Sequence, residues 1–149
     1  MSDLRAVQPL VDQETGLAVV STTRANGTIQ ATVVNAGILA HPISAEQVVG
    51  FVTRGGTRKH HHLRARSFCT VTFRRGWRWA TVEGDAELIG PDDPADDVDP
   101  DRLRLLLRDI FRAAGGTHDD WQEYDRVMAA ERRLAVLVSP RRVYSSHGG

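Results

Sequence analysis

The chain has 149 residues, of which 41% are apolar and 26% are charged, and its formal net charge is zero. This length suffices for one globular domain with a sizeable core, while the neutral balance argues against broad electrostatic binding to nucleic acid. No apolar run approaches the ~18 residues that cross a bilayer. The N-terminus lacks the apolar core of a signal peptide, and Cys69 is the only cysteine, so we expect a cytoplasmic protein.

The first third of the chain predicts a short helix followed by three strands. Leu4, Val7 and Leu10 have helical spacing, and Gly16 ends the helix. The dipeptide Asn26-Gly27 indicates a hairpin, because a two-residue primed turn requires positive φ. We expect strands over residues 17–22, 28–39 and 47–53.

The third strand leads into a basic, glycine-containing stretch, residues 53–64, on which we expect the site to depend. Gly55 and Gly56 free the backbone for a tight turn, and a short helix is expected to start near Thr57. N–H groups at a helix start, together with basic side chains, can hold an anion. Lys59 is the only lysine of the chain. From spacing alone, an anion site and a solvated basic helix face fit about equally well.

Two further strands are expected over residues 68–73 and 77–89. In the second of these, Trp77 and Trp79 alternate with the side chains that face the core. Large aromatic rings on the other face need a cover, which a partner subunit or a planar ligand would provide. The expected core positions of this strand are Ala80, Val82, Ala86 and Leu88.

The last third of the chain predicts a solvated acidic linker at 91–100, a pair of helices at 101–133 and a final strand at 134–144. Thr117 or Asp119 is expected to cap the second helix. An extended piece is expected after Ser139-Pro140. The order of elements favours a mainly β fold: one domain over residues 1–149, built as a small antiparallel barrel with the helices packed outside.

No other arrangement of reactive side chains in the sequence predicts a catalytic or metal site. On a helix, consecutive side chains diverge by ~100°, so residues 60–62 cannot bind one metal ion together. The chain has no nucleophile triad, Walker loop or dinucleotide fingerprint. We therefore assign no catalytic residue and no metal site, and expect a bound cofactor to carry any chemistry.

Several stretches, taken in order, resemble the pyridoxamine 5′-phosphate oxidase-like split-barrel superfamily. More narrowly, the chain is similar to the actinobacterial flavin/deazaflavin oxidoreductases that use coenzyme F420. The stretches that carry the resemblance are Asn26-Gly27 with Gln30-Ala31-Thr32, Thr57-Arg58-Lys59 with Leu63, residues 77–84, residues 118–121, Tyr124, Met128, Arg132-Arg133 and Val143-Tyr144.

The resemblance implies a homodimer of six-stranded antiparallel split β-barrels of the FMN-binding kind, with two cofactor sites between the subunits. It implies that Thr57, Arg58 and Lys59 hold the cofactor phosphate, and that Met128 and Arg132 arrive from the partner. His62 stands where family members often have Asn. The other implied cofactor positions are Thr32, Val33, Val34 and Asn35 against the ring, Thr53 and Arg54 beside them, and Trp77 and Trp79 at the site and interface.

The activity implied is an F420H2-dependent reductase that transfers a hydride to an unsaturated or conjugated small-molecule acceptor. Arg54, Arg58, Lys59 and Arg64 would then follow the anionic phosphodiester and glutamate tail of the cofactor. Two alternatives stay open: an FMN-binding oxidase or reductase of the same superfamily, and a non-catalytic binder of flavin, F420 or haem.

Overall fold

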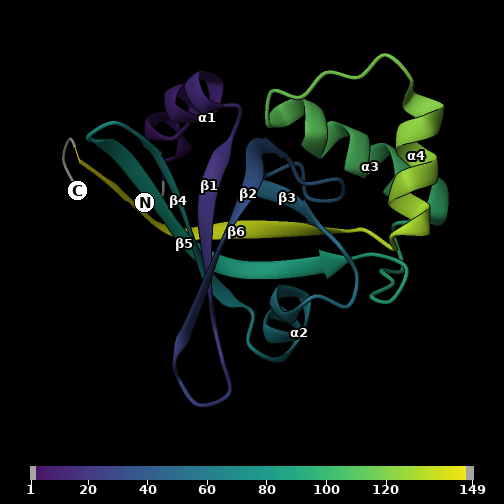
Figure 1. The fold of residues 1–149 in the computed structure, drawn as a ribbon, viewed down its shortest axis with the longest axis horizontal. Helices are drawn as coiled ribbons and strands as arrows, with labels where there is room; N and C mark the ends of the chain where they lie inside the picture. The colour runs from purple at the N-terminus through teal and green to yellow at the C-terminus, as the bar shows by residue number, and fades with distance from the viewer. Residues whose placement is uncertain (1–2, 147–149) are drawn as a thin grey trace.

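Six strands form a closed antiparallel barrel in the order β1-β2-β3-β6-β5-β4 in the computed structural model, which describes residues 3–146 (Figure 1). The predicted mainly β barrel is confirmed. None of the helices within the described range is long and apolar enough to cross a membrane. The strands are β1 (Leu17–Thr23), β2 (Ile29–Ala40), β3 (Gln47–Thr53), β4 (Phe68–Arg75), β5 (Arg78–Ile89) and β6 (Leu134–Ser145).

The helices cover separate parts of this barrel. Figure 1 shows α3 and α4 together on one side, α1 beside β1, and α2 beneath the barrel. The core inside the barrel includes Val20, Phe51 and Phe73, whereas Ile110 and Leu137 belong to a second apolar cluster under α3 and α4. The helices are η1 (Leu4–Ala6), α1 (Gln8–Glu14), α2 (Arg58–Ala65), α3 (Pro100–Ala113) and α4 (Trp121–Ala130).

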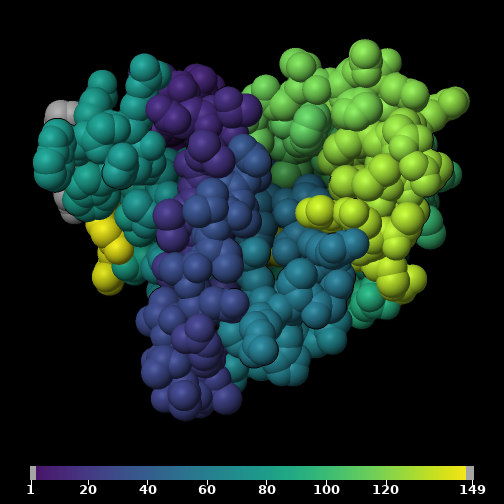
Figure 2. Space-filling model, viewed as in Figure 1, coloured from purple at the N-terminus to yellow at the C-terminus, as the bar shows by residue number. Residues whose placement is uncertain are grey.

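The long strand β2 closes the barrel because its two halves pair with different neighbours. Residues 29–35 pair with β1, and residues 36–40 pair with β3. On the outer face of the first half, Ile29 is 58% exposed and Val33 is 66% exposed. Figure 2 shows this part of β1 and β2 (purple to indigo) at the surface without a helix over it. An apolar sheet face is therefore left uncovered in one chain.

The turn between β1 and β2 differs from the predicted two-residue turn. Gly27 has a positive φ of 86°, and Asn26 is not among the positive-φ residues. Arg24 N–H donates to the Thr28 carbonyl (2.8 Å), and Gly27 N–H donates to the Arg24 carbonyl (2.9 Å). The hairpin is confirmed, but its loop has three residues that end in a left-handed glycine, which is the next most common solution for such a connection.

The last third of the chain contains the expected elements, with one helix cap corrected and two details added. Asp120 caps α4 by accepting from Glu123 N–H (3.1 Å), in place of Thr117 or Asp119. β6 confirms the final strand expected at 134–144 and runs continuously through Pro140, since a register shift opposite Glu83/Gly84 accommodates a residue without an N–H donor. Most residues of the acidic linker are exposed, as expected, but the linker is anchored at Val98, which is only 8% exposed.

The close contact between β2 and α3 gives a test of the fold. The backbone of Gly37 lies against Ala113 at the end of α3, and a Cβ at this position would stand 2.6 Å from the Ala113 carbonyl oxygen. Gly37→Ala should lower the free energy of unfolding by about 1–3 kcal/mol, measured by urea denaturation. The control Ala40→Ser, at an exposed position of the same strand, should stay within about 0.5 kcal/mol of the wild type. Equal stabilities of the two variants would contradict this packing.

Candidate functional site

The glycine turn between β3 and α2 is fixed by two different constraints. Gly56 has a φ of +82°, which favours glycine. Gly55 has no room for a side chain, because a Cβ there would stand 2.6 Å from the carbonyl oxygen of Arg132. Thr57 caps α2 by accepting a hydrogen bond from His60 N–H (3.3 Å), which confirms the helix start expected near this residue. The turn is thus pressed against the chain that follows α4.

Lys59 lies in the first turn of α2 and is half-buried. No acceptor within residues 3–146 takes a hydrogen bond from its ammonium group. Burial lowers the pKa of Lys59, and the positive charge of Arg133 lowers it further. The first turn of a helix also leaves N–H groups without intrahelical acceptors. An anion at this position would meet both a cation and backbone donors.

His60 connects the glycine turn to the acidic linker, a role that its sequence position did not suggest. Its ring is 3% exposed, and its Nδ1 accepts from Gly56 N–H (3.0 Å). This bond leaves the proton on Nε2, which donates to Asp93 (2.6 Å). Arg64 also donates to Asp93 (2.9 Å). Arg64 is therefore held on the linker side of α2, which does not fit the expectation that it follows the charge of a cofactor.

His62 faces the end of the barrel rather than the linker. Its side chain is 8% exposed, and its Nδ1 lies 3.3 Å from the Thr22 hydroxyl. Burial lowers the pKa of His62, and the positive charges of Arg24, Arg66, His61 and Arg58 lower it further. His62 is thus neutral near pH 7 and occupies a strongly positive environment.

A cavity of about 510 Å³ opens where the α3–α4 pair meets β2 and β3. It brings together Asn35 and Met128, two positions that the resemblance implied for the cofactor. The Asn35 side-chain amide donates to the Thr15 carbonyl (2.7 Å), which fixes its orientation. Arg133 lines the same cavity and acts electrostatically on Lys59, so the cavity and α2 are neighbours. Sequence reasoning missed Val52 and residues 114–117 of this lining.

Tyr124 is the one tyrosine in the lining of this cavity. Its hydroxyl donates to the Leu107 carbonyl (3.1 Å), and burial raises the pKa of Tyr124 to about 12. The phenol therefore keeps its proton at neutral pH and already uses it in a hydrogen bond. Tyr124 contributes shape to the cavity rather than a proton.

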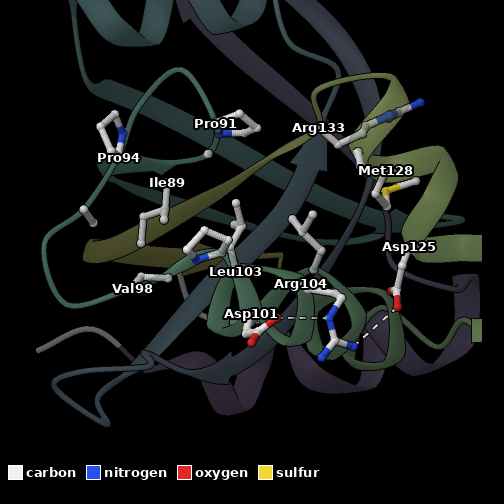
Figure 3. A pocket seen from close by; sticks show the side chains of 15 residues that line it. Ile89, Pro91, Pro94, Val98, Asp101, Leu103, Arg104, Asp125, Met128 and Arg133 are labelled. Atoms are coloured by element: carbon white, nitrogen blue, oxygen red, sulfur yellow. Dashed lines mark hydrogen bonds and ion pairs between the residues drawn. The ribbon is translucent and has the colours of Figure 1, made fainter. Parts of the chain in front are cut away.

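A second cavity, of about 480 Å³, lies between the linker and the α3–α4 pair (Figure 3). Figure 3 shows apolar side chains such as Val98 and Leu103 along it, and the pair of Arg104 and Asp125 at its rim (3.4 Å). Met128 and Arg133 line this cavity as well as the first one. These two side chains thus separate the cavities.

Some of the implied cofactor positions come together within one chain. Thr53, Arg54, Thr57, Arg58 and Lys59 follow each other through the glycine turn, and the Arg132 backbone packs on it. Arg54 also approaches Glu131 (3.6 Å). The side chain of Arg132 pairs with Asp92 (2.5 Å).

The implied cofactor positions on β2 and around the start of β5 do not all face the glycine turn. Val33 lies on the exposed outer face, whereas Val34 packs against the barrel core; Thr32 shares the inner side with Val34. Trp77 is 95% exposed. Because α2 precedes β4 and Trp77 follows it, the eight residues of β4 separate them by about 25 Å. Neither Trp77 nor Trp79, which packs edge-on against Tyr144 (6.1 Å), lies at α2 of the same chain.

Comparisons with known proteins agree on the fold. The family model of pyridoxamine 5′-phosphate oxidase matches residues 5–144. The conserved hypothetical protein Rv2991 from Mycobacterium tuberculosis is 18% identical with a TM-score of 0.66 (97% of this chain, 84% of that chain). An F420 reductase is 16% identical with a TM-score of 0.60 (92% and 94%). An FMN-binding, pyridoxamine 5′-phosphate oxidase-related protein from Nostoc punctiforme is 14% identical with a TM-score of 0.64 (97% and 84%).

The anchor between His60 and Asp93 predicts a loss of stability at low pH. Burial raises the pKa of Asp93, but hydrogen bonds from Arg64 and His60 outweigh it, so this pKa lies below its usual value. A depressed carboxyl pKa stabilises the fold above the unfolded value, about 3.9, and this stabilisation is lost as the pH falls through the folded pKa. Asp93→Asn should lower the free energy of unfolding by roughly 1.5–3 kcal/mol at pH 7. Its free energy of unfolding should also lack the decrease at low pH that Asp93 causes in the wild type, as measured by urea denaturation at several pH values.

The neighbouring carboxylate supplies the matched control for this test. Asp92 is 44% exposed and pairs with Arg132 at the surface. Asp92→Asn removes the same charge one residue away and should destabilise the protein less. If both variants lost the same stability, the anchor at His60 would have no special role.

Proposed function

The chain belongs to the pyridoxamine 5′-phosphate oxidase family, and on this premise we propose that it is a homodimeric reductase that uses reduced coenzyme F420. The observation that carries the proposal is the juxtaposition of Lys59, which has no acidic partner in the described chain, with a cavity large enough for a planar ring. The cavity volume of about 510 Å³ falls within the range of small-molecule sites. The F420 reductase with the same fold supports the choice of cofactor.

The residues of the glycine turn fit a phosphate group. The close approach of Gly55 to the Arg132 backbone, together with the left-handed Gly56, fixes the start of α2. Thr57, Arg58 and Lys59 would hold the phosphate there, through a hydroxyl, a guanidinium, an ammonium and the N–H groups of the first turn. The half-buried ammonium of Lys59 provides the charge, because nothing within residues 3–146 neutralises it.

The cavity and the end of the barrel fit the remainder of such a cofactor. Asn35, Val52 and Met128 surround a mostly apolar space that suits a planar ring. The amide oxygen of Gln30 is buried and has no hydrogen-bond partner among the described residues. A buried acceptor of this kind is costly unless a donor reaches it, and a hydroxyl group of a bound molecule can supply one.

The bound deazaflavin would supply the hydride, and the protein would supply position. The first turn of α2 orients the phosphate end, and the α3–α4 pair bounds the ring space. Orientation of two bound molecules is a large source of rate enhancement when no side chain takes part in covalent chemistry. The phenol of Tyr124 holds its proton against the Leu107 carbonyl. We therefore assign the proton that completes acceptor reduction to solvent, and no residue as catalytic.

Two alternatives make different demands on the same residues. FMN ends in a phosphate monoester, which Lys59 could also bind. An FMN-dependent enzyme would therefore use the same glycine turn. A haem carrier needs a free axial ligand. His60 uses both ring nitrogens, for Gly56 and Asp93, which argues against haem at this histidine.

The homodimer is proposed from the uncovered face of β1 and β2. Val19 and Val33 are directly paired across the two strands, and both are exposed, as is Leu17. Together with Ile29, they form an apolar face that monomeric proteins rarely leave in contact with water. The ring cavity reaches this face through Asn35, which pairs with Leu17. A second copy packed on the face would therefore also close the site.

The proposal predicts selective cofactor binding that depends on Lys59. Purified protein is titrated with F420 and, separately, with FMN, and cofactor fluorescence is followed. We expect F420 to bind more tightly than FMN. Lys59→Ala removes a charge-assisted hydrogen bond and should weaken F420 binding about ten- to a hundredfold, with an unchanged circular dichroism spectrum.

A charge control separates this site effect from a change of overall charge. Arg5→Ala removes one positive charge on the N-terminal segment, where Arg5 pairs with Asp3, and should bind F420 like the wild type. Preference for FMN would assign the protein to the flavin branch of the family. If the protein bound neither F420 nor FMN, the proposed function would be overturned.

The dimer predicts a change in molecular mass for one variant. Val33→Asp places a charge in the centre of the apolar face and should convert a dimer into a monomer, as measured by light scattering after size exclusion. Ile43→Asp is the matched control, because Ile43 is 47% exposed but lies in the turn between β2 and β3. A monomeric wild-type protein, or a Val33→Asp variant that stays dimeric, would contradict this interface.

A further inference from the structure

The proposed function does not use the cavity of about 480 Å³ between the linker and the α3–α4 pair (Figure 3). One wall is formed by Ile89 and the linker that follows it, and the other by Leu103 and Leu107 of α3 and Met128 of α4. This volume lies within the range of small-molecule sites. The cavity thus has the size of a binding site, and the chemistry of its walls determines which molecule fits.

The linker side of this cavity offers few polar groups to a bound molecule. Three of its lining residues are prolines, which have no N–H group. The Gly90 N–H donates to the Asp93 carbonyl (3.0 Å), and the Val98 N–H donates to the Ala95 carbonyl (3.1 Å). These donors are therefore engaged within the linker. Because a buried water molecule needs about two to four polar partners, water is held poorly at this wall and an apolar molecule can displace it.

The charged side chains of the lining are each paired already. Arg104 lies within ion-pair distance of Asp101 (4.0 Å) and Asp125 (3.4 Å), as Figure 3 shows. Arg133 pairs with Glu131 (2.8 Å). A ligand with a carboxylate would bring a further anion close to Asp101 and Asp125, and a cationic ligand would compete with Arg104. An uncharged ligand leaves these pairs intact.

We propose that this cavity is a binding site for an uncharged, mostly apolar small molecule. Burial of apolar surface against Val98, Leu103 and Leu107 supplies the affinity. An ionised group would lose its hydration without a gain in return, since the charges at the rim are already paired. This inference goes beyond the proposed function and does not depend on which cofactor the neighbouring cavity holds.

The lining allows each cavity to be filled separately. Met128 and Arg133 contribute to both cavities, whereas Ala129 lines only the cavity at the linker and Thr117 lines only the proposed cofactor cavity. Ala130 follows Ala129 on α4, is also exposed, and lines neither cavity. A larger side chain at one of these positions therefore blocks one cavity, the other, or neither.

The probe for the test is N-phenyl-1-naphthylamine, an uncharged dye whose fluorescence rises in apolar surroundings. The wild type and the variants Ala129→Phe, Ala130→Phe and Thr117→Phe are titrated with it. Ala129→Phe fills the proposed site and should weaken dye binding about tenfold or more. Ala130→Phe is the matched control, and both it and Thr117→Phe should bind the dye within about twofold of the wild type.

The variant Val33→Asp tests whether the dye binds instead to the exposed apolar face of β1 and β2. It should bind the dye like the wild type. Ala95→Leu, which fills the proposed site from the linker side, should repeat the loss seen in Ala129→Phe, and thermal unfolding checks that both variants are folded. Absence of saturable binding to the wild type, or a loss of binding in Thr117→Phe or Val33→Asp, would overturn the proposal.

A second arm tests the absence of charge on the ligand. Methyl decanoate and decanoate, which is ionised at neutral pH, are used to displace the dye. The ester should displace it at about tenfold lower concentration than the acid. Equal displacement by the two would contradict an uncharged ligand. Neither arm uses F420 or FMN, so failure of this inference leaves the proposed function untouched, and the reverse also holds.

Discussion

The hydrogen bond from Gly56 N–H to the imidazole of His60 fixes the segment on which the candidate site depends. Because the same imidazole donates to Asp93, the glycine turn, α2 and the linker after β5 are bonded to one another. Gly55 packs against the backbone of Arg132, which ties this unit to the end of α4. The candidate binding site on this short turn is thereby held by two segments that are distant along the chain, as precise recognition requires.

The distribution of charge follows from this arrangement. The chain has no net charge, yet its cations and anions are not evenly mixed. Carboxylates of the linker pair with Arg64 and Arg132. By contrast, no carboxylate among the described residues pairs with Lys59, Arg58, Arg24 or Arg66. A neutral protein can thus offer a strongly cationic site, and only the local pairing reveals it.

The exposed face of β1 and β2 lies beside the candidate site and is also the proposed dimer interface. Asn35 belongs to the ring cavity and pairs with Leu17, whose side chain lies on the uncovered apolar face. Trp77 lies at the far end of β4 from α2 and is almost fully exposed. Within one chain it cannot contribute to the cavity, so a role in binding requires a second copy.

Local patterns in the sequence determined the strands, the N-terminal cap of α2 and the special place of Gly55, Gly56 and Lys59. Alternation, helix capping and left-handed turns act between residues that are close along the chain, so they can be read without a structure. The three-residue hairpin loop was not predicted, because turn length depends on how the flanking strands pair.

Only the tertiary structure decided which polar groups meet. His60 and Asp93 are 33 residues apart, and His62 and Thr22 are 40 residues apart. Three adjacent histidines looked equivalent in the sequence, yet one anchors the linker, one faces the barrel, and His61 is exposed. Coulomb forces and hydrogen bonds depend on distance in space rather than on separation along the chain. For this reason the sequence pointed to the stretch that we propose as an anion site, and the fold determined which of its cations have no carboxylate partner among the described residues.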